Sequence, residues 1–132
     1  MVEENAIVRK FQKELNSGTV SLVVLSLMDA STEPLYGYQI AKLLEAQAEG
    51  QLPMKQGALY PVLRAMEANG LLRSNVEPST SAPPRRYYSV TVEGHNMLAI
   101  WINVWGNTRD FVERVLSGVA GNGSQDEERE DV

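Results

Sequence analysis

Hydrophobic residues in the middle of the chain recur with the spacing of one helix face. Leu59, Val62, Leu63 and Met66 stand at positions i, i+3, i+4 and i+7 of a short segment, which is the period of an amphipathic α-helix. Gly70 follows where a left-handed cap would end such a helix. Leu71 and Leu72 then begin an extended segment. The pattern predicts a short helix with a buried stripe that leads directly into a strand.

Polar and basic residues occupy another face of the same helix. Tyr60 and Arg64 stand away from the apolar stripe, and Lys55 and Gln56 stand at the entry to the helix. An apolar stripe on one side and polar aromatic and basic groups on the other are typical of a helix that packs inward and contacts a partner outward. We therefore expect a recognition helix followed by a wing.

Pro61 lies within the first turns of this predicted helix. Proline lacks a donor N–H and crowds the carbonyl group four residues before it, which here belongs to Gly57. We therefore expect the first turn to be distorted, or the helix to begin late.

The first thirty residues contain two apolar segments. Residues four apart predict an amphipathic helix over residues 1–17, which Ser17 and Gly18 are expected to end. Thr19 then offers an N-cap to a second helix over residues 20–28. The nearly continuous apolarity of this second segment is also compatible with a buried strand, but its leucines and the cap favour a helix. The apolar residues of the first helix are Ile7, Phe11 and Leu15.

A further helix is expected from Leu35 onward. Ile40, Leu43 and Leu44 have the spacing of residues that face inward, and Lys42 stands on the outward side. This helix and the central one are separated by a short turn. Two short helices joined in this way, the second with a polar outer face, are typical of a helix-turn-helix.

Two extended segments follow the central helix. Residues 72–76 and 86–90 are short runs with strand-favouring side chains, separated by a polar, proline-rich connection over residues 77–85. A hairpin that carries basic residues at its base and follows a recognition helix is typical of a wing. We therefore expect a small β-hairpin here.

The last helix is unusually apolar. Thr91 can cap its N-terminus, and more than half of its circumference is hydrophobic, which exceeds what one small domain can cover. We therefore expect it to pack against a partner chain. Gly106 and Asn107 weaken its middle and are expected to kink or break it. Its main stripe consists of Met97, Ile100, Trp101, Val104, Thr108, Phe111, Val112 and Val115.

The composition is that of one ordinary domain. The chain has 132 residues, of which 43% are hydrophobic, and it has no cysteine, so a disulfide framework and a cysteine-ligated metal site are excluded. Its start lacks the basic and apolar regions of a secretory signal, and no apolar run is long enough to span a bilayer. We expect a cytoplasmic protein that does not associate with membranes.

The charge distribution is uneven along the chain. The formal net charge is −5, but residues 125–132 alone carry five acids and one arginine. Residues 55–86 carry five basic residues and two acids. A local basic surface on a nearly neutral body can bind phosphate backbones, although an excess of this size also arises by chance.

The sequence offers no catalytic constellation. His95 is the only histidine, and neither a nucleophile–base pair, a phosphate-binding loop nor a metal-ligand cluster accompanies it. We therefore expect a protein that is not an enzyme and that needs no cofactor and no metal ion.

Three segments together resemble the PadR family of transcriptional regulators. They are Leu35-Tyr-Gly-Tyr-Gln-Ile-Ala, Gly57-Ala-Leu-Tyr-Pro-Val-Leu-Arg-Ala-Met-Glu-Ala-Asn-Gly-Leu-Leu72 and Pro84-Arg-Arg-Tyr-Tyr-Ser-Val-Thr-Val-Glu-Gly94. Their order and spacing fit the family, and the resemblance covers roughly residues 18–116. The short C-terminal part is similar to the smaller subfamily, in which one terminal helix dimerises.

The resemblance implies a mainly α fold with a small β wing. A winged helix-turn-helix domain is expected over residues 18–91 and a dimerisation helix over residues 92–117, followed by a disordered acidic tail over residues 118–132. It also implies a homodimeric repressor on a palindromic operator in double-stranded DNA. The implied DNA-binding residues are Gln56, Tyr60 and Arg64 in the major groove, Lys55, Arg85 and Arg86 on phosphates, and Gly57 at the helix start.

Trp105 resembles a tryptophan with which multidrug-sensing members of this family stack flat aromatic ligands, and Trp101 lies one turn earlier. The resemblance therefore implies a planar aromatic effector held between indoles. Packing of both tryptophans in a dimer core is the alternative, because aromatic stripes at helical spacing are more often packing. For the whole chain, the alternative function is a winged helix that binds only proteins.

Overall fold

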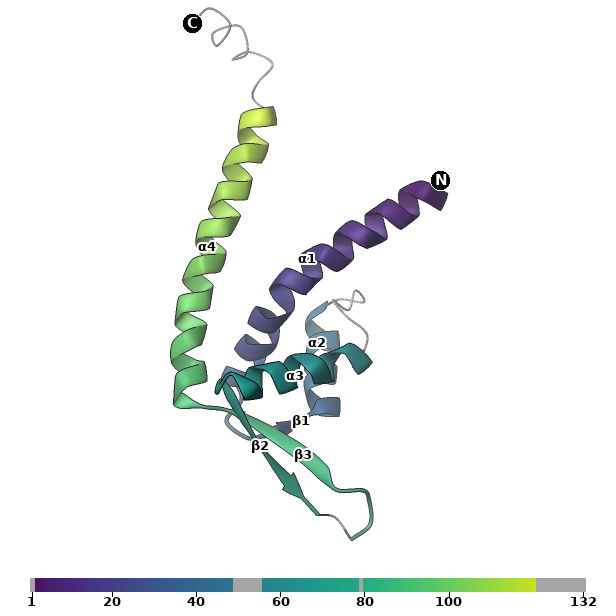
Figure 1. Ribbon diagram of the computed structural model, residues 1–132, viewed down its shortest axis with the longest axis vertical. Helices are drawn as coiled ribbons and strands as arrows, with labels where there is room; N and C mark the ends of the chain where they lie inside the picture. Colours follow the sequence, from purple (N-terminus) through teal and green to yellow (C-terminus); the bar gives the residue numbers. More distant parts are fainter. Residues whose placement is uncertain (1, 49–55, 79, 121–132) are drawn as a thin grey trace, which may run out of the picture. The chain divides into compact units, whose positions relative to one another are not determined.

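A computed structural model describes residues 2–48, 56–78 and 80–120 of the chain (Figure 1). The chain forms two units, residues 1–98 and 99–132, and each is considered by itself. The elements in chain order are α1 (Val2–Asp29), β1 (Leu35–Tyr36), α2 (Gly37–Ala48), the 3₁₀ turn η1 (Gln56–Ala58), α3 (Leu59–Ala68), β2 (Leu72–Glu77), β3 (Arg85–Val90) and α4 (Val92–Ala120).

Helix α1 is continuous, so the predicted break at Ser17 and Gly18 is wrong. Thr19 does not act as an N-cap. Its hydroxyl donates back to the carbonyl oxygens of Leu15 and Asn16, at 3.2 and 3.4 Å. Such back-bonding is how threonine is accommodated inside a helix. The prediction of a helix over residues 20–28 is confirmed, because Val24, Leu25 and their neighbours lie in the second half of α1.

The helix expected from Leu35 begins two residues later. Leu35 and Tyr36 form the short strand β1, and α2 starts at Gly37. Ile40 and Leu44 of α2 are buried as predicted, but Leu43 is 39% exposed, so its predicted inward position is wrong.

The predicted hairpin is confirmed and is joined by a third strand. The sheet order is β1-β3-β2, with both pairs antiparallel. Leu72 lies opposite Val90, and Glu77 lies opposite Arg85 at the far end of the hairpin. Strand β1 pairs with β3 through Leu35 with Tyr88 and Tyr36 with Tyr87, and this pairing covers the open edge of β3.

Helix α3 begins late, as the proline predicted. Residues 56–58 form a 3₁₀ turn, and the α-helix starts at Leu59, which leaves Pro61 in the first turn, where the helix lacks internal N–H partners. At the other end Gly70 has φ of 78°. Its N–H donates to the Glu67 carbonyl and that of Leu71 to the Met66 carbonyl, which together form a Schellman cap.

The core of the first unit joins its three helices to the sheet. Apolar side chains from α1, α2 and α3 pack with the start of β2 and with Tyr88 of β3, and none of the described polar side chains is buried among them. The arrangement is mainly helical with a small antiparallel sheet, which confirms the predicted fold class. Its largest fully buried side chains are Val24, Leu25, Ile40, Leu59, Leu63 and Leu72.

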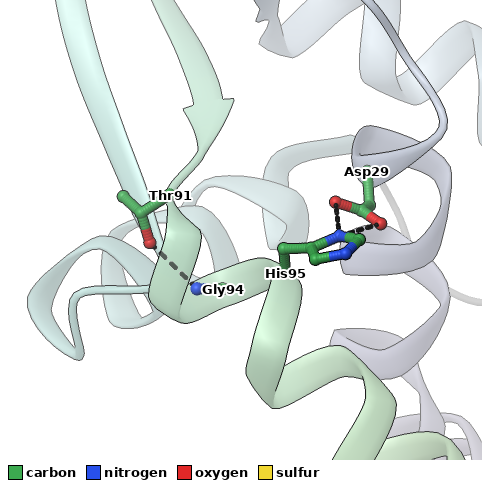
Figure 2. Close-up of polar contacts among 4 residues, drawn as sticks. All are labelled: Asp29, Thr91, Gly94 and His95. Atoms are coloured by element: carbon green, nitrogen blue, oxygen red, sulfur yellow. Dashed lines mark hydrogen bonds and ion pairs between the residues drawn. The ribbon is translucent and has the colours of Figure 1, made fainter.

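The start of α4 lies within the first unit and contacts other elements of that unit; Figure 2 shows its contact with the end of α1. Thr91 is the predicted N-cap, since its hydroxyl oxygen accepts the N–H of Gly94 at 2.9 Å and donates to the Gly70 carbonyl at 2.6 Å. Nδ1 of His95 lies 2.9 and 3.0 Å from the two carboxylate oxygens of Asp29, at the end of α1. His95 thus links the two helices.

Helix α4 runs without interruption from Val92 to Ala120. The predicted break at Gly106 and Asn107 is therefore wrong, and the helix extends three residues beyond the predicted end at residue 117. The rest of the expected tail, residues 121–132, lies outside the described residues.

Candidate nucleic-acid interface

The outer face of α3 carries two of the predicted DNA-binding side chains. Tyr60 is 43% exposed and Arg64 is also exposed, while Leu59 and Leu63 of the same helix are buried in the core. Gly57 is exposed in the 3₁₀ turn that precedes α3. The helix therefore presents a polar face to solvent beside the hairpin that follows it.

Two residues of the predicted set are not placed in the same detail. Lys55 lies outside the described residues. Gln56 is described only as the first residue of the 3₁₀ turn, so it stands at the entry to α3 as expected. Their predicted contacts with DNA stay predictions.

The ring of Tyr60 on α3 packs against Gly37, the first residue of α2. A Cβ added to the buried Gly37 would lie 2.7 to 2.9 Å from Oη, Cζ and Cε1 of the Tyr60 ring. Because atoms cannot approach so closely, a larger residue at position 37 would displace the far end of the Tyr60 ring. The first residue of α2 thus leaves space for the position that Tyr60 takes on the outer face of α3.

Arg86 is connected to α3 through a serine. Nη1 of Arg86 donates to Oγ of Ser74 on β2 at 2.8 Å, and Ser74 donates to Oε2 of Glu67 on α3 at 2.6 Å. A hydrogen bond to an ionised carboxylate is among the stronger ones. These two hydrogen bonds link the hairpin to the helix and hold Arg86 on the side of the sheet that faces α3.

Tyr88 lies on the same side of the hairpin and is only 2% exposed. Burial raises the pKa of its phenol, and the carboxylate of Glu67 raises it further, while Arg86 and Arg64 lower it. These residues therefore share one electrostatic environment at the junction of α3 and β3.

Arg85 lies on the opposite face of the sheet from Arg86. Successive side chains of a strand point to opposite faces, and Arg85 shares its face with Tyr87 and with Tyr36 of β1. Its guanidinium Cζ lies 4.5 Å from the centroid of the Tyr36 ring. The two neighbouring arginines, predicted together as phosphate ligands, are thus held by different elements.

Three residues of this region were not in the predicted set: Gly37, Glu67 and Ser74 place the predicted side chains. The alternation along residues 85–90 did contain the signal that separates Arg85 from Arg86. Nothing local in the sequence indicates the contacts that Gly37 and Ser74 make, because their partners lie in other elements.

The two tryptophans belong to the second unit. Trp105 is 39% exposed and Trp101 is half-buried, one turn apart on α4. Large apolar side chains along the same helix, among them Ile100, Val104 and Phe111, are more than half exposed. The described chain by itself therefore leaves an apolar surface on α4 uncovered.

Three helices followed by a two-stranded hairpin, with a polar face on the third helix, define a winged helix-turn-helix protein. The comparison with protein families agrees, since residues 24–100 match the Transcriptional regulator PadR-like family. The chain belongs to this family of transcriptional regulators.

Solved structures of the same family are similar over most of the chain. A PadR family transcriptional regulator from Eggerthella lenta is 34% identical, with a TM-score of 0.76, over 88% of this chain and 97% of the other. A PadR-like transcriptional regulator from Bacillus cereus is 25% identical, with a TM-score of 0.63, over 80% of this chain and 98% of the other.

A more distant structure contains DNA. PadR of Bacillus subtilis, solved in complex with operator DNA, is 19% identical with a TM-score of 0.55, over 63% of this chain and 46% of the other. At this identity the likeness shows a common fold. Among curated proteins no sequence matches the chain. Across the described residues, each helix is too short or too polar to cross a membrane.

Proposed function

We propose that this PadR-family regulator is a homodimeric repressor that binds a palindromic operator in double-stranded DNA. The observation that carries the proposal is the exposed polar face of α3, with Tyr60 and Arg64, directly beside a hairpin whose Arg86 is tied to the same helix. A helix of this kind fits the major groove, and basic side chains of a wing fit the phosphate backbone.

The proposed dimer is supported by uncovered apolar surfaces in both units. In the first unit, Ile7, Phe11 and Leu15 of α1 are between 48% and 67% exposed. In the second, the exposed apolar residues of α4 continue over several turns. Surfaces of this extent are rarely left open to water on a monomer. A two-fold dimer would present two α3 helices to half-sites ~34–36 Å apart.

The direct test starts by selecting bound duplexes from a random pool and measuring affinity over a series of salt concentrations. Phosphate contacts release counterions, so the affinity of a DNA-binding protein falls steeply with salt. We expect Arg64→Ala to weaken binding of the selected duplex by about 1–3 kcal/mol. Arg9→Ala, which removes an exposed arginine from the first half of α1, is the matched control and is expected to bind normally.

The alternative function, a winged helix that contacts only proteins, predicts a different result in the same assay. It predicts that no duplex is enriched, and that any residual binding does not depend on sequence. Equal loss in Arg64→Ala and Arg9→Ala would likewise favour a general charge effect over groove recognition.

A planar aromatic effector is a finer part of the proposal. Trp105 and Trp101 stand on the uncovered part of α4, where two symmetry-related helices would bring indoles close together. Flat aromatic ligands stack well between such rings. Titration with planar cationic dyes is expected to quench tryptophan fluorescence in the unaltered chain and not in Trp105→Leu. Unchanged emission at saturating dye would contradict an effector role.

A further inference from the structure

Arg85 and Arg86 are neighbours in β3 but differ in how they are held. One N–H group of Arg86 donates a hydrogen bond to the Ser74 hydroxyl oxygen. Arg85 instead lies over the ring of Tyr36, with its guanidinium carbon 4.5 Å from the ring centroid. A cation over a ring is attracted by the quadrupole of the ring, and this attraction needs no N–H donor.

The ring of Tyr36 is itself fixed from three directions. Its backbone is paired with β3, opposite Tyr87. The Tyr87 ring meets it edge-on, with centroids 5.3 Å apart and planes at 69°. The Tyr38 ring stacks on it at 6.4 Å and 18°. Tyr36 is half-buried. Its ring is therefore restricted in its motion and can restrict an exposed side chain that lies over it.

The residue opposite Arg85 on the neighbouring strand carries a carboxylate. Glu77 lies directly opposite Arg85 in the hairpin, but the ion pairs of the described residues do not include these two. The guanidinium contacts the Tyr36 ring instead. Among the described residues, no carboxylate therefore engages its N–H groups, and they stay available to an external anion.

This arrangement suits a phosphate ligand. A guanidinium presents five N–H donors in a planar fork that matches two oxygens of a phosphate. A long side chain that is ordered before binding loses less conformational freedom when the phosphate arrives. Tyr36 can supply that order while leaving the donors of Arg85 unused.

We propose that Tyr36 is a positioning residue for DNA binding, whose ring holds the Arg85 guanidinium ready for a backbone phosphate of the operator. The inference rests on the proposed DNA-binding function and adds to it a residue outside both α3 and the hairpin. It also assigns the two faces of the wing different roles, since Arg86 is fixed to α3 through Ser74 and Glu67.

The test measures how operator affinity depends on salt in four variants. Arg85→Ala is expected to reduce the slope of log affinity against log salt by about one per protomer. Tyr36→Ile keeps a strand-favouring side chain but removes the ring, and is expected to reduce the slope in the same direction. Tyr36→Phe keeps the ring and is expected to match the unaltered chain. Tyr36→Ile combined with Arg85→Ala is expected to equal Arg85→Ala alone.

A second measurement uses the protein without DNA. Side-chain protons of an arginine that lies over a tyrosine ring are shifted upfield in the NMR spectrum by the ring current. We expect this shift for Arg85 in the unaltered chain and in Tyr36→Phe, and its loss in Tyr36→Ile. If Tyr36→Ile does not fold, as judged by circular dichroism, Tyr36→Leu replaces it in both measurements.

The outcomes separate this inference from the function on which it rests. Normal, salt-dependent operator binding with an unchanged slope in Tyr36→Ile would overturn the positioning role alone. An equal further loss when Tyr36→Ile is added to Arg85→Ala would also overturn it, because the two residues would then act independently. Failure of the unaltered chain to bind any duplex, with the Arg85 ring-current shift present, would overturn the DNA-binding function and with it this role.

Discussion

Gly94 stands where the first turn of α4 passes the end of the Schellman turn after α3. A Cβ at this position would collide with the carbonyl oxygen of Leu71 and would lie 2.9 Å from Cγ1 of Val90. The same carbonyl oxygen accepts the backbone N–H of Thr91 at 3.1 Å, so it has little freedom to move. Glycine is therefore required by space and not by backbone conformation.

We expect Gly94→Ala to destabilise the protein by about 1–3 kcal/mol, the usual effect of forcing extra atoms into a packed site. Gly18→Ala is the matched control, because a Cβ there meets nothing within 4 Å and lies inside α1. Alanine is expected to stabilise that helix by up to about 1 kcal/mol. Urea unfolding measures both. Equal stability of the two variants would show that the contact at Leu71 is relieved without strain.

Residue identities alone do not reveal such roles. Gly37 and Gly94 are alike in the sequence, where both stand near a helix start, yet one makes room for the Tyr60 ring and the other for a backbone carbonyl. Gly70 is different, because a glycine after a short amphipathic helix predicts a positive φ, and the structure has it. The first two roles depend on partners from other elements.

At the scale of elements, one hydroxyl group makes two of the contacts at the junction between β3 and α4. Thr91 accepts the N–H of Gly94, as Figure 2 shows. Its hydroxyl also donates to the Gly70 carbonyl. It thus caps α4 and also ties that cap to the end of α3. The contact between His95 and Asp29 adds a link from the same turn to α1.

We expect Thr91→Ala to lower the free energy of unfolding by about 0.5–2 kcal/mol, which is the usual loss for an N-cap. Thr91→Ser keeps the hydroxyl group and is expected to stay close to the unaltered chain. Denaturant unfolding compares the two. A similar loss in Thr91→Ser would mean that the threonine methyl group, and not the cap, provides the stabilisation.

Some helices and strands form because of residues within a turn of one another, and others form only through contacts with distant parts of the chain. Helix α3 was predicted with its stripe, its late start and its cap, because Pro61 and Gly70 act within a turn of their own positions. Strand β1 was not predicted, since two residues become a strand only when the edge of β3 lies beside them. Helix α1 continues through Ser17 and Gly18, where local propensity favoured a break.

At the scale of the whole molecule, α4 carries an apolar stripe that the described residues leave exposed. Ile100, Val104 and Phe111 are each more than half exposed in the second unit. We propose that a second copy of the chain covers them, as argued above for the homodimer. A charge in such a stripe would have to be buried without a partner, which opposes association.

We therefore expect Val104→Glu to shift the protein from dimer to monomer in sedimentation velocity and to abolish operator binding with it. Asn103→Glu is the matched control, because this exposed neighbour lies outside the apolar stripe. It is expected to stay dimeric. A dimer in both variants would mean that this part of α4 is not the interface.

The sequence by itself determined the existence of α2 and α3, the C-cap of α3, the N-cap of α4, the hairpin and the family resemblance, but not the continuity of α1. These features arise from periodicity and from cap chemistry, which act between residues a few positions apart. The tertiary structure decided which of the predicted DNA-binding side chains are held in place, and which residues hold them. Arg85 lies over Tyr36, 49 positions away, and Arg86 is linked to Glu67 through Ser74. Strand pairing and the packing of α3 on the sheet bring these residues together, and neither can be read from local spacing.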